Sequence, residues 1–343
     1  MIRLWKPSDE PALKALWRDT FGDPDVYIDK VIFKYKTAPE SIMLFESGGK
    51  LISAVHMPRS GFNFWGKELS AAYVMGVATD KSERGHGYMR PLMNNALKSM
   101  YDSDTSFCTL IPAEGWLYDY YAGFGFTEAF YLKKDEVYIN KSGAFNEEVS
   151  ESRDDEALYR FYRDYFRDEP FYIKKSLKDL KAVLTDHRLG KGRVLIHKTN
   201  GRIDGACFVI SDSGGCLVKE LCASENKVRG ALLSYAASLY DTEKLKMISR
   251  PRNAREDGAY RRGMIRAVSV FDVLGAYAAA HEEESLALSV KDDNISVNTG
   301  VYRLSDGVVS KISDEAYDEA LSPAEVMRFV LKGQTCYMNL MLD

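Results

Sequence analysis

The chain has 343 residues, of which 45% are hydrophobic and 28% are charged, with a formal net charge of −4. This length and hydrophobic content are enough for two or three domains with cores of their own. The negative charge argues against a nucleic-acid-binding protein, because such proteins are more often basic. The cysteines and histidines are scattered without CxxC pairs or other metal-ligand spacing, so we expect no metal site.

The N-terminal residues and the cysteines bear on localisation. The opening residues, MIRLWKPSDE, lack the apolar segment of a signal peptide, and no stretch approaches the length of a transmembrane helix. An odd number of scattered cysteines also fits a reducing compartment. We therefore expect a cytoplasmic protein with no membrane partner.

The first predicted elements are strands around a single helix. Ser8-Asp9 can cap this helix, and Gly22 is its natural end. Gly48-Gly49 has the composition of a hairpin turn between two strands. The predicted strands are residues 2–5, 42–46, 51–58 and a further one that begins at Leu69.

The most informative segment is a basic, glycine-containing turn between a strand and a helix. The run from Tyr73 to Val77 is apolar enough for a buried strand, and apolar residues recur at helical spacing from Met89 to about Tyr101. Glycines in Arg84-Gly85-His86-Gly87 would let backbone N–H groups approach an anion, and the helix adds free N–H donors. Neither a Rossmann nor a Walker pattern is present. The segment therefore predicts a phosphate site of the acyl-CoA type, with a turn that only reverses the chain as the alternative.

The motif from Arg84 to Met89 resembles the acyl-CoA motif of the GNAT superfamily of N-acetyltransferases: Arg or Gln, two residues, Gly, one residue, then Gly or Ala. Met89 departs at the last position, where members of the enhanced intracellular survival (Eis) branch have larger apolar residues. The chain also resembles that branch in its long C-terminal extension. The resemblance implies acetyl-CoA as co-substrate, held by the strand before the turn and by the turn itself. It assigns Val77, Ala78 and Thr79 to the pantetheine arm, and Arg84, Gly85, His86, Gly87, Tyr88, Met89 and Arg90 to the pyrophosphate.

A second motif surrounds a short helix predicted at Tyr118. GNAT chains commonly place a tyrosine four residues before a Gly-aromatic pair, and Tyr121 stands at that distance from Gly125-Phe126. The resemblance implies that Tyr121 protonates the departing thiolate, and that Trp116 and Leu117 contact the cofactor. Tyr118 is the rival donor, and packing in the core is the alternative role. The strands that flank the motif are residues 105–111 and 130–139.

Residues 141–262 repeat the element order of the middle of the first domain. A polar stretch through Asp155 predicts a linker, and Asn200-Gly201 predicts a hairpin turn. The junction over residues 222–230, CASENKVRG, has no Gly-x-Gly. We therefore expect a degenerate copy that does not bind CoA, and tandem halves of this kind occur in the Eis family. The predicted elements are a helical region over 157–184, strands over 193–197, 203–211 and 216–223, and a helix over 228–240.

Residues 263–343 predict a third, strand-rich domain. Ser322 and Glu325 have the spacing of a capping box, at the start of a helix that ends near Leu331. By pattern and order the segment resembles the sterol-carrier-protein-like domain that closes Eis-type chains. In those enzymes the terminal carboxylate serves as a base for the amine, a role that falls on Asp343 here, with a loose terminus as the alternative. The predicted strands are residues 286–290, 295–299, 301–304 and 308–312.

The pattern as a whole predicts an α/β (α+β) fold with two tandem GNAT-like domains, residues 1–140 and 141–262, and a sterol-carrier-protein-like domain, residues 263–343. The resemblance implies an N-acetyltransferase that moves acetyl from acetyl-CoA to a primary amine of a small cationic molecule or a lysine side chain. The amine would attack directly, without a metal. Because Cys108 lies in a predicted buried strand, we expect it to be a core residue and not an acyl carrier.

The resemblance also implies a homo-oligomer, with a hexamer as the candidate. The leading alternative to an enzyme is a catalytically silent acyl-CoA-binding regulatory protein. A lipid carrier built on the last domain ranks below both.

Overall fold

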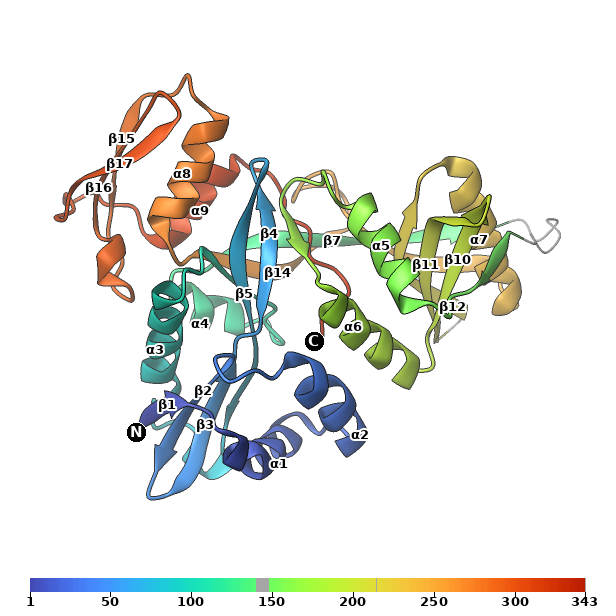
Figure 1. The fold of residues 1–343 in the computed structure, drawn as a ribbon, viewed down its shortest axis with the longest axis horizontal. Coiled ribbons are helices and arrows are strands. Elements are labelled where there is room, and N and C mark those ends of the chain that lie inside the picture. Colours follow the sequence, from blue (N-terminus) through green and yellow to red (C-terminus); the bar gives the residue numbers. More distant parts are fainter. Residues whose placement is uncertain (140–147, 214, 343) are drawn as a thin grey trace.

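The computed structural model describes residues 1–139, 148–213 and 215–342, and Figure 1 shows three regions that follow the order of the sequence. Within the described residues, one mixed sheet of 14 strands runs through the first two regions, and a separate three-stranded sheet lies in the third. The predicted α/β (α+β) class is confirmed.

The first region is built around the long strand β5 (Lys67–Thr79). It pairs antiparallel with β3 on one side and parallel with β6 on the other. The Gly48-Gly49 turn joins β2 to β3 as predicted, with both glycines at positive φ. The pattern missed β4, which forms a hairpin with the start of β5. The other elements are β1 (Ile2–Leu4), α1 (Glu10–Phe21), α2 (Asp25–Tyr27), β2 (Ile42–Ser47), β3 (Lys50–His56), β4 (Arg59–Phe64), α3 (Met89–Asp102), β6 (Phe107–Leu110), α4 (Leu117–Ala122) and β7 (Thr127–Tyr138).

Helices cover both faces of β5. Val74 packs with the buried residues of α3 and α4 on one face, whereas Tyr73 and Met75 belong to the core on the other, as the alternation of a strand requires. The second face is covered in part by a π-helical segment, Ile28–Lys36, that the sequence pattern did not predict. Helix α1 ends as predicted at Gly22, which has a φ of 75°.

The second region repeats the arrangement of the first. Strand β12 pairs antiparallel with β11 and parallel with β13, and α7 connects the two parallel strands. The predicted 157–184 helical region is in fact two helices separated by β9. The elements are β8 (Val149–Glu151), α5 (Asp155–Tyr165), β9 (Tyr172–Lys174), α6 (Leu177–Leu189), β10 (Arg193–Thr199), β11 (Arg202–Asp212), β12 (Gly215–Ala223), α7 (Asn226–Leu239), β13 (Lys244–Ser249) and β14 (Ala259–Ala267).

Strands β7 and β14 join the two regions into one sheet. Strand β14 is the last element of the second region in sequence, but it lies between β6 and β7 of the first, and β7 also pairs with β13. The predicted domain limits stay predictions. The first limit falls beside the undescribed residues 140–147, and the second falls inside β14.

The third region contains two helices beside an antiparallel sheet. The predicted capping box is present, because the Ser322 hydroxyl accepts a bond from the Glu325 N–H. The predicted strand over residues 295–299 is wrong. A 3-10 turn lies there, since the Asp292 and Asn298 side chains bond to the nearby backbone in place of a strand neighbour. The elements are α8 (Val270–Ala280), β15 (Leu286–Val290), β16 (Gly300–Ser305), β17 (Val308–Ser313) and α9 (Pro323–Leu331).

After α9 the chain turns back into the centre of the molecule, where its end is marked in Figure 1. The Cys336 N–H donates to the Ala129 carbonyl at 2.8 Å, and the Tyr337 N–H donates to the Phe171 carbonyl at 2.7 Å. The tail therefore contacts both halves of the large sheet.

No helix in the described part of the chain is long and apolar enough to cross a membrane. Among the same residues, no group of three or more His, Cys, Asp and Glu side chains is placed to bind a metal ion. Cys108 is fully buried, and burial raises the pKa of its thiol to about 12. The predicted core position of Cys108 is confirmed.

Candidate active site

Strand β5 has one open edge in its second half. Its pairing with β6 ends at Val74, so in the described structure residues 75–79 have a strand partner only on the β3 side. The three predicted pantetheine residues, Val77, Ala78 and Thr79, all lie on this segment. The backbone groups of an unpaired strand edge can bind an extended amide-containing chain, which is the character of a pantetheine arm.

A glycine inside β5 marks the start of the open edge. Gly76 has a φ of 55°, next to a shift in the register between β3 and β5. A Cβ atom there would lie 2.2 Å from Cζ3 of Trp17, so no other residue fits. Gly76 is not among the predicted site residues, although an isolated glycine within a strand pattern is a signal for a bulge.

The predicted phosphate turn connects β5 to α3. Gly85 and Gly87 have φ values of 81° and 78°, and residues 84–87 are exposed. No described residue accepts a hydrogen bond from the backbone N–H of Gly85, His86 or Gly87. Together with the first turn of α3, these donors make a suitable cradle for a phosphate group.

The basic and aromatic side chains of the turn lie around this cradle. The Arg84 Nε donates to the Thr79 carbonyl at 3.2 Å, which ties the turn to the end of β5. The Arg90 guanidinium lies 5.2 Å from the centre of the Phe124 ring. The Tyr88 ring stacks on the Phe45 ring of β2. Tyr88 and Met89 are both half-buried, and Met89 is the first residue of α3.

Helix α4 carries both candidate proton donors. Tyr121 is 6% exposed, and its ring packs against Phe126 in the cluster that contains Val74. Burial raises the pKa of the Tyr121 hydroxyl, so the phenol stays protonated at neutral pH. Burial also raises the pKa of Tyr118, whose ring lies 4.0 Å from the Arg261 guanidinium of β14. The two tyrosines thus face different neighbours.

The other predicted residues of this helix differ in exposure. Trp116 is 61% exposed and its indole N–H donates to Glu114 at 2.8 Å, whereas Leu117 is half-buried at the start of α4. Asp343 lies outside the described residues. The residue before it, Leu342, is described, and its carbonyl accepts a bond from the Tyr73 hydroxyl at 3.3 Å.

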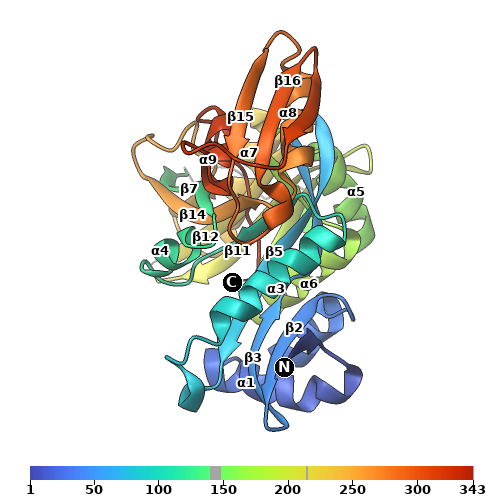
Figure 2. The same cartoon turned by 90° about the vertical axis from the view of Figure 1, so that its left-hand side faces the viewer.

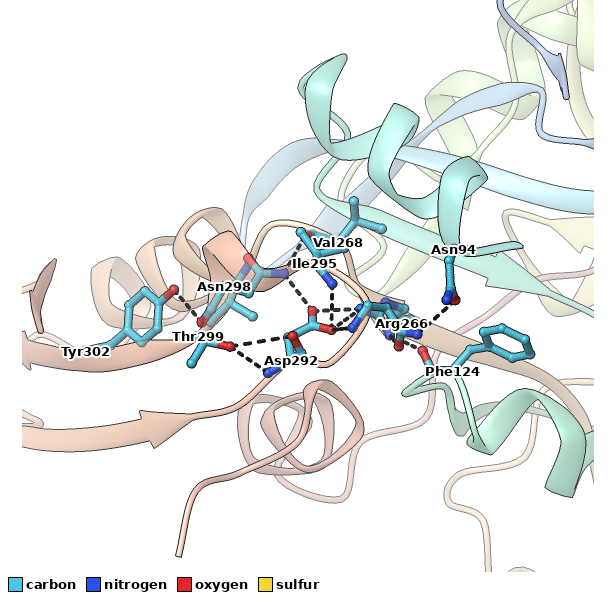
Figure 3. A network of polar contacts seen from close by, with 11 residues as sticks. Asn94, Phe124, Arg266, Val268, Asp292, Ile295, Asn298, Thr299 and Tyr302 are labelled. Atoms are coloured by element: carbon cyan, nitrogen blue, oxygen red, sulfur yellow. Dashed lines mark hydrogen bonds and ion pairs between the residues drawn. The ribbon is translucent and has the colours of Figure 1, made fainter. Parts of the chain in front are cut away.

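A buried ion pair between β14 and the third region holds the end of α4 (Figure 3). The side chains of Arg266 and Asp292 are both 0% exposed and meet through two contacts of 2.7 Å. The Arg266 guanidinium also donates to the carbonyl of Phe124, three residues after Tyr121. Gly125 permits this approach, because a Cβ there would lie 2.5 Å from the Arg266 Nη1.

The same network reaches α3. The Arg266 guanidinium donates to the Asn294 side chain at 3.0 Å, and the Asn294 amide donates to Asn94 of α3 at 3.0 Å (Figure 3). One set of polar contacts therefore joins α3, which follows the phosphate turn, to the end of α4, which carries the candidate proton donor. No local sequence signal identified Arg266 or Asp292, because their pairing depends on the return of β14 to the first region.

The open edge of β5 leads directly into the glycine turn, and the turn leads into α3. Residues 1–129 match the family model of the acetyltransferase (GNAT) domain. GNAT domains use acetyl-CoA, and the match supports acyl transfer as the reaction class. The matched residues contain β5, the phosphate turn and α4.

Solved structures similar to the whole chain include several acetyltransferases. A GCN5-related N-acetyltransferase from Anabaena variabilis has a TM-score of 0.74 at 16% identity, covering 94% of this chain and 88% of its own. A probable N-acyltransferase from Enterococcus faecalis has a TM-score of 0.74 at 15% identity, covering 94% and 86%. Eis1 from Mycobacterium abscessus has a TM-score of 0.70 at 13% identity, covering 94% and 87%. At these identities the likeness shows the fold. A search among curated proteins found no match in sequence.

Figure 2 shows α3 crossing in front of β5. The face of β5 that carries Tyr73 lies against the tail, whereas the face that carries Val74 lies against α3. Strand β5 therefore has one face toward α3, which follows the phosphate turn, and the other toward the tail.

Proposed function

We propose that the protein transfers an acetyl group from acetyl-CoA to a primary amine by direct attack, without a covalent enzyme intermediate. The observation that carries the proposal is the open edge of β5 leading directly into the glycine turn and α3. The cradle fits an anion because its backbone donors have no protein acceptor among the described residues.

In this proposal the backbone groups of residues 77–79 hold the pantetheine arm, and Gly85 to Arg90 hold the pyrophosphate. Arg84 and Arg90 supply positive charge beside the turn. A backbone N–H at the open edge would polarise the thioester carbonyl, which favours attack because the developing oxyanion is stabilised. These are the roles that the sequence resemblance assigned.

The amine nitrogen forms a bond to the carbonyl carbon, and the bond from that carbon to sulfur breaks. We propose that the Tyr121 hydroxyl donates its proton to the departing thiolate. The phenol is protonated at neutral pH, so its hydroxyl has a proton to donate. The nitrogen loses its extra proton to a base or to water.

We also propose an Eis-type enzyme, with the third region as a sterol-carrier-protein-like domain and a homo-oligomeric assembly. The similarity of fold to Eis1 over 94% of this chain supports the first part. The tail reaches Tyr73 on β5, which supports a role for residues near Asp343 at the acceptor side.

The test is a Tyr121→Phe variant, with Tyr118→Phe as its matched control on the same helix. Acetyl-CoA turnover is measured by release of free thiol, and CoA affinity by calorimetry. For Tyr121→Phe we expect kcat to fall by roughly ten- to a thousandfold while CoA affinity is kept, as for loss of a proton donor. Tyr118→Phe should keep kcat within about threefold.

Other outcomes separate the alternatives. The reverse pattern would make Tyr118 the donor, and unchanged turnover in both variants would remove the phenol from the mechanism. Tight CoA binding with no thiol release on any amine would favour the silent acyl-CoA-binding protein.

A further inference from the structure

A groove lies between the first two regions, on the side of β5 away from α3. It has a volume of about 620 Å³ and is bounded by β4 and β5 of the acetyltransferase domain and by α5 and β9 of the second region. It continues into a narrower cavity lined by Tyr73 and by the tail at Leu342. The residues that line both spaces are Arg59, Ser60, Lys174, Lys175 and Asp179.

The carboxylates of the groove are already paired. Asp179 forms an ion pair with Lys36, and Glu68 forms one with Lys174 at 2.5 Å. A third cation of the wall, Arg163, is paired with Asp164. Neither of the two acidic side chains that line the groove is therefore free to receive a cationic ligand.

Lys175 is a buried cation without an ion pair in the described structure. It is 9% exposed, and its ammonium donates one bond, to the Asn339 carbonyl at 2.7 Å. The ammonium also lies 5.7 Å from the ring centres of Tyr162 and Tyr172, and of its three N–H donors only one is used in a hydrogen bond of the described structure. The pKa of Lys175 is lowered to about 8, because burial and the charge of Lys36 together outweigh the raising effect of Glu220 and Asp179.

Arg59 is the second cation of both spaces without a carboxylate partner among the described residues. It is exposed, and its guanidinium donates to the Ser103 carbonyl at 2.9 Å. A guanidinium has five N–H donors in a fixed fork that matches a carboxylate. Arg59 at the surface and Lys175 in the interior thus present positive charge where the groove meets the narrow cavity.

Building on the proposed acetyl transfer, we propose that the acceptor is an amine that also carries a carboxylate, such as a free amino acid. Its carboxylate lies between Arg59 and Lys175, and its amine lies in the groove and points toward β5. A polyamine would meet like charge here, because the acidic side chains of the groove are committed to lysines. The cationic lining therefore departs from the cationic acceptor that the family resemblance implies.

Matched pairs of acceptors test this assignment, because an amino acid and its decarboxylated amine differ only in the carboxylate. The pairs are lysine with cadaverine, histidine with histamine and tyrosine with tyramine. Thiol release is measured for the wild-type protein and for Lys175→Met and Arg59→Gln, and binding of each compound is measured by calorimetry. Arg188→Gln is the control, since this exposed cation is paired with Asp155 away from the groove.

We expect wild type to prefer at least one amino acid over its decarboxylated partner in kcat/KM. Lys175→Met should lower kcat/KM for that amino acid by roughly ten- to a hundredfold, the size expected for a charge-assisted hydrogen bond, and leave the decarboxylated amine within about threefold. Arg59→Gln should act in the same direction with a smaller effect, because Arg59 is exposed. CoA affinity and thermal stability check that each variant is folded.

The results that would overturn this inference differ from those that would overturn the proposed function. Turnover of cadaverine, histamine and tyramine at least as efficient as that of the amino acids would overturn the inference and leave the transferase intact. If no amine is acetylated, the proposed function fails, and the inference is decided by binding alone. Amino-acid binding that is equal in wild type and Lys175→Met would then overturn it. Preference for phosphoethanolamine over every amino acid would keep the anion site and overturn the carboxylate assignment.

Discussion

The two halves of the large sheet use the same unit, a strand followed by a helix that returns to a parallel strand, but their junctions differ. In the first half, residues 80–88 join β5 to α3, with Gly85 and Gly87 at positive φ. In the second half, only Ser224 and Glu225 join β12 to α7. So short a junction has no room for several N–H groups around one phosphate. The degeneracy of the second copy, predicted from its missing Gly-x-Gly, stays a prediction that this difference supports.

The strand edges beside the two junctions differ in the same way. The parallel pairing of β12 ends at Val218, and the next carbonyl, that of Lys219, accepts a bond from the Asn339 amide at 2.7 Å. The Glu220 carboxylate accepts a bond from the Tyr337 hydroxyl. The chain's own tail thus occupies a position in the second half that corresponds to the open edge of β5 in the first. One architecture serves as a candidate cofactor site in one copy and as a docking site for the tail in the other.

The first prediction concerns the stability that Asp292 of the third region gives to the half of the sheet with the open edge of β5. For Asp292→Asn we expect a loss of about 3–5 kcal/mol in the free energy of unfolding, because the Arg266 charge stays buried without its partner. Urea unfolding measures this loss. The control is Asp155→Asn, which breaks the exposed pair with Arg188 and should cost less than about 1 kcal/mol. Equal losses in the two variants would contradict a structural role for the buried pair.

The second prediction concerns Lys175, which binds the tail in the second half. Its pKa is about 8 in the folded protein, below the ordinary lysine value of 10.5, so between these pH values the unfolded chain binds more protons and stability rises with pH. The difference corresponds to about 3 kcal/mol. We expect the free energy of unfolding of wild type relative to Lys175→Met to increase by up to about 3 kcal/mol between about pH 7.5 and pH 10. If the stability difference between wild type and Lys175→Met does not change with pH, the pKa of Lys175 is not lowered in the folded protein.

The smallest predicted effect separates the two junctions directly. Gly87 has a φ of 78°, and a Cβ added to it would meet no atom within 4 Å, so Gly87→Val changes backbone strain without a side-chain clash. A strain of about 1–3 kcal/mol should weaken CoA binding by roughly five- to a hundredfold, which calorimetry measures. Gly230→Ala on α7 is the matched change in the second copy.

For Gly230→Ala we expect CoA affinity within about twofold of wild type and a gain of up to about 1 kcal/mol in stability, because alanine favours a helix over glycine. A comparable loss of CoA affinity in both variants would mean that the second junction also takes part in binding. An unchanged affinity in Gly87→Val would remove the turn from the cofactor site.

Local features of the fold could be predicted because their causes are close in sequence. Gly22 ends α1, Gly48-Gly49 turns between β2 and β3, and the Ser322 capping box begins α9, each through backbone preferences of a few residues. The phosphate turn belongs to the same class, since its two glycines and the helix that follows are adjacent in the chain. Its functional role stays a prediction, as do those of Tyr121 and Asp343.

The sequence by itself determined the order of strands and helices, the glycine turn and the family likeness of the first region, because these depend on short-range spacing. Only the tertiary structure decided that β14 returns between β6 and β7, that Arg266 meets Asp292 and Phe124, and that the tail lies on β12. The charge of the acceptor groove belongs to this second group. Its cations come from segments far apart in sequence, and whether each is paired or free depends on which carboxylates the fold brings to it.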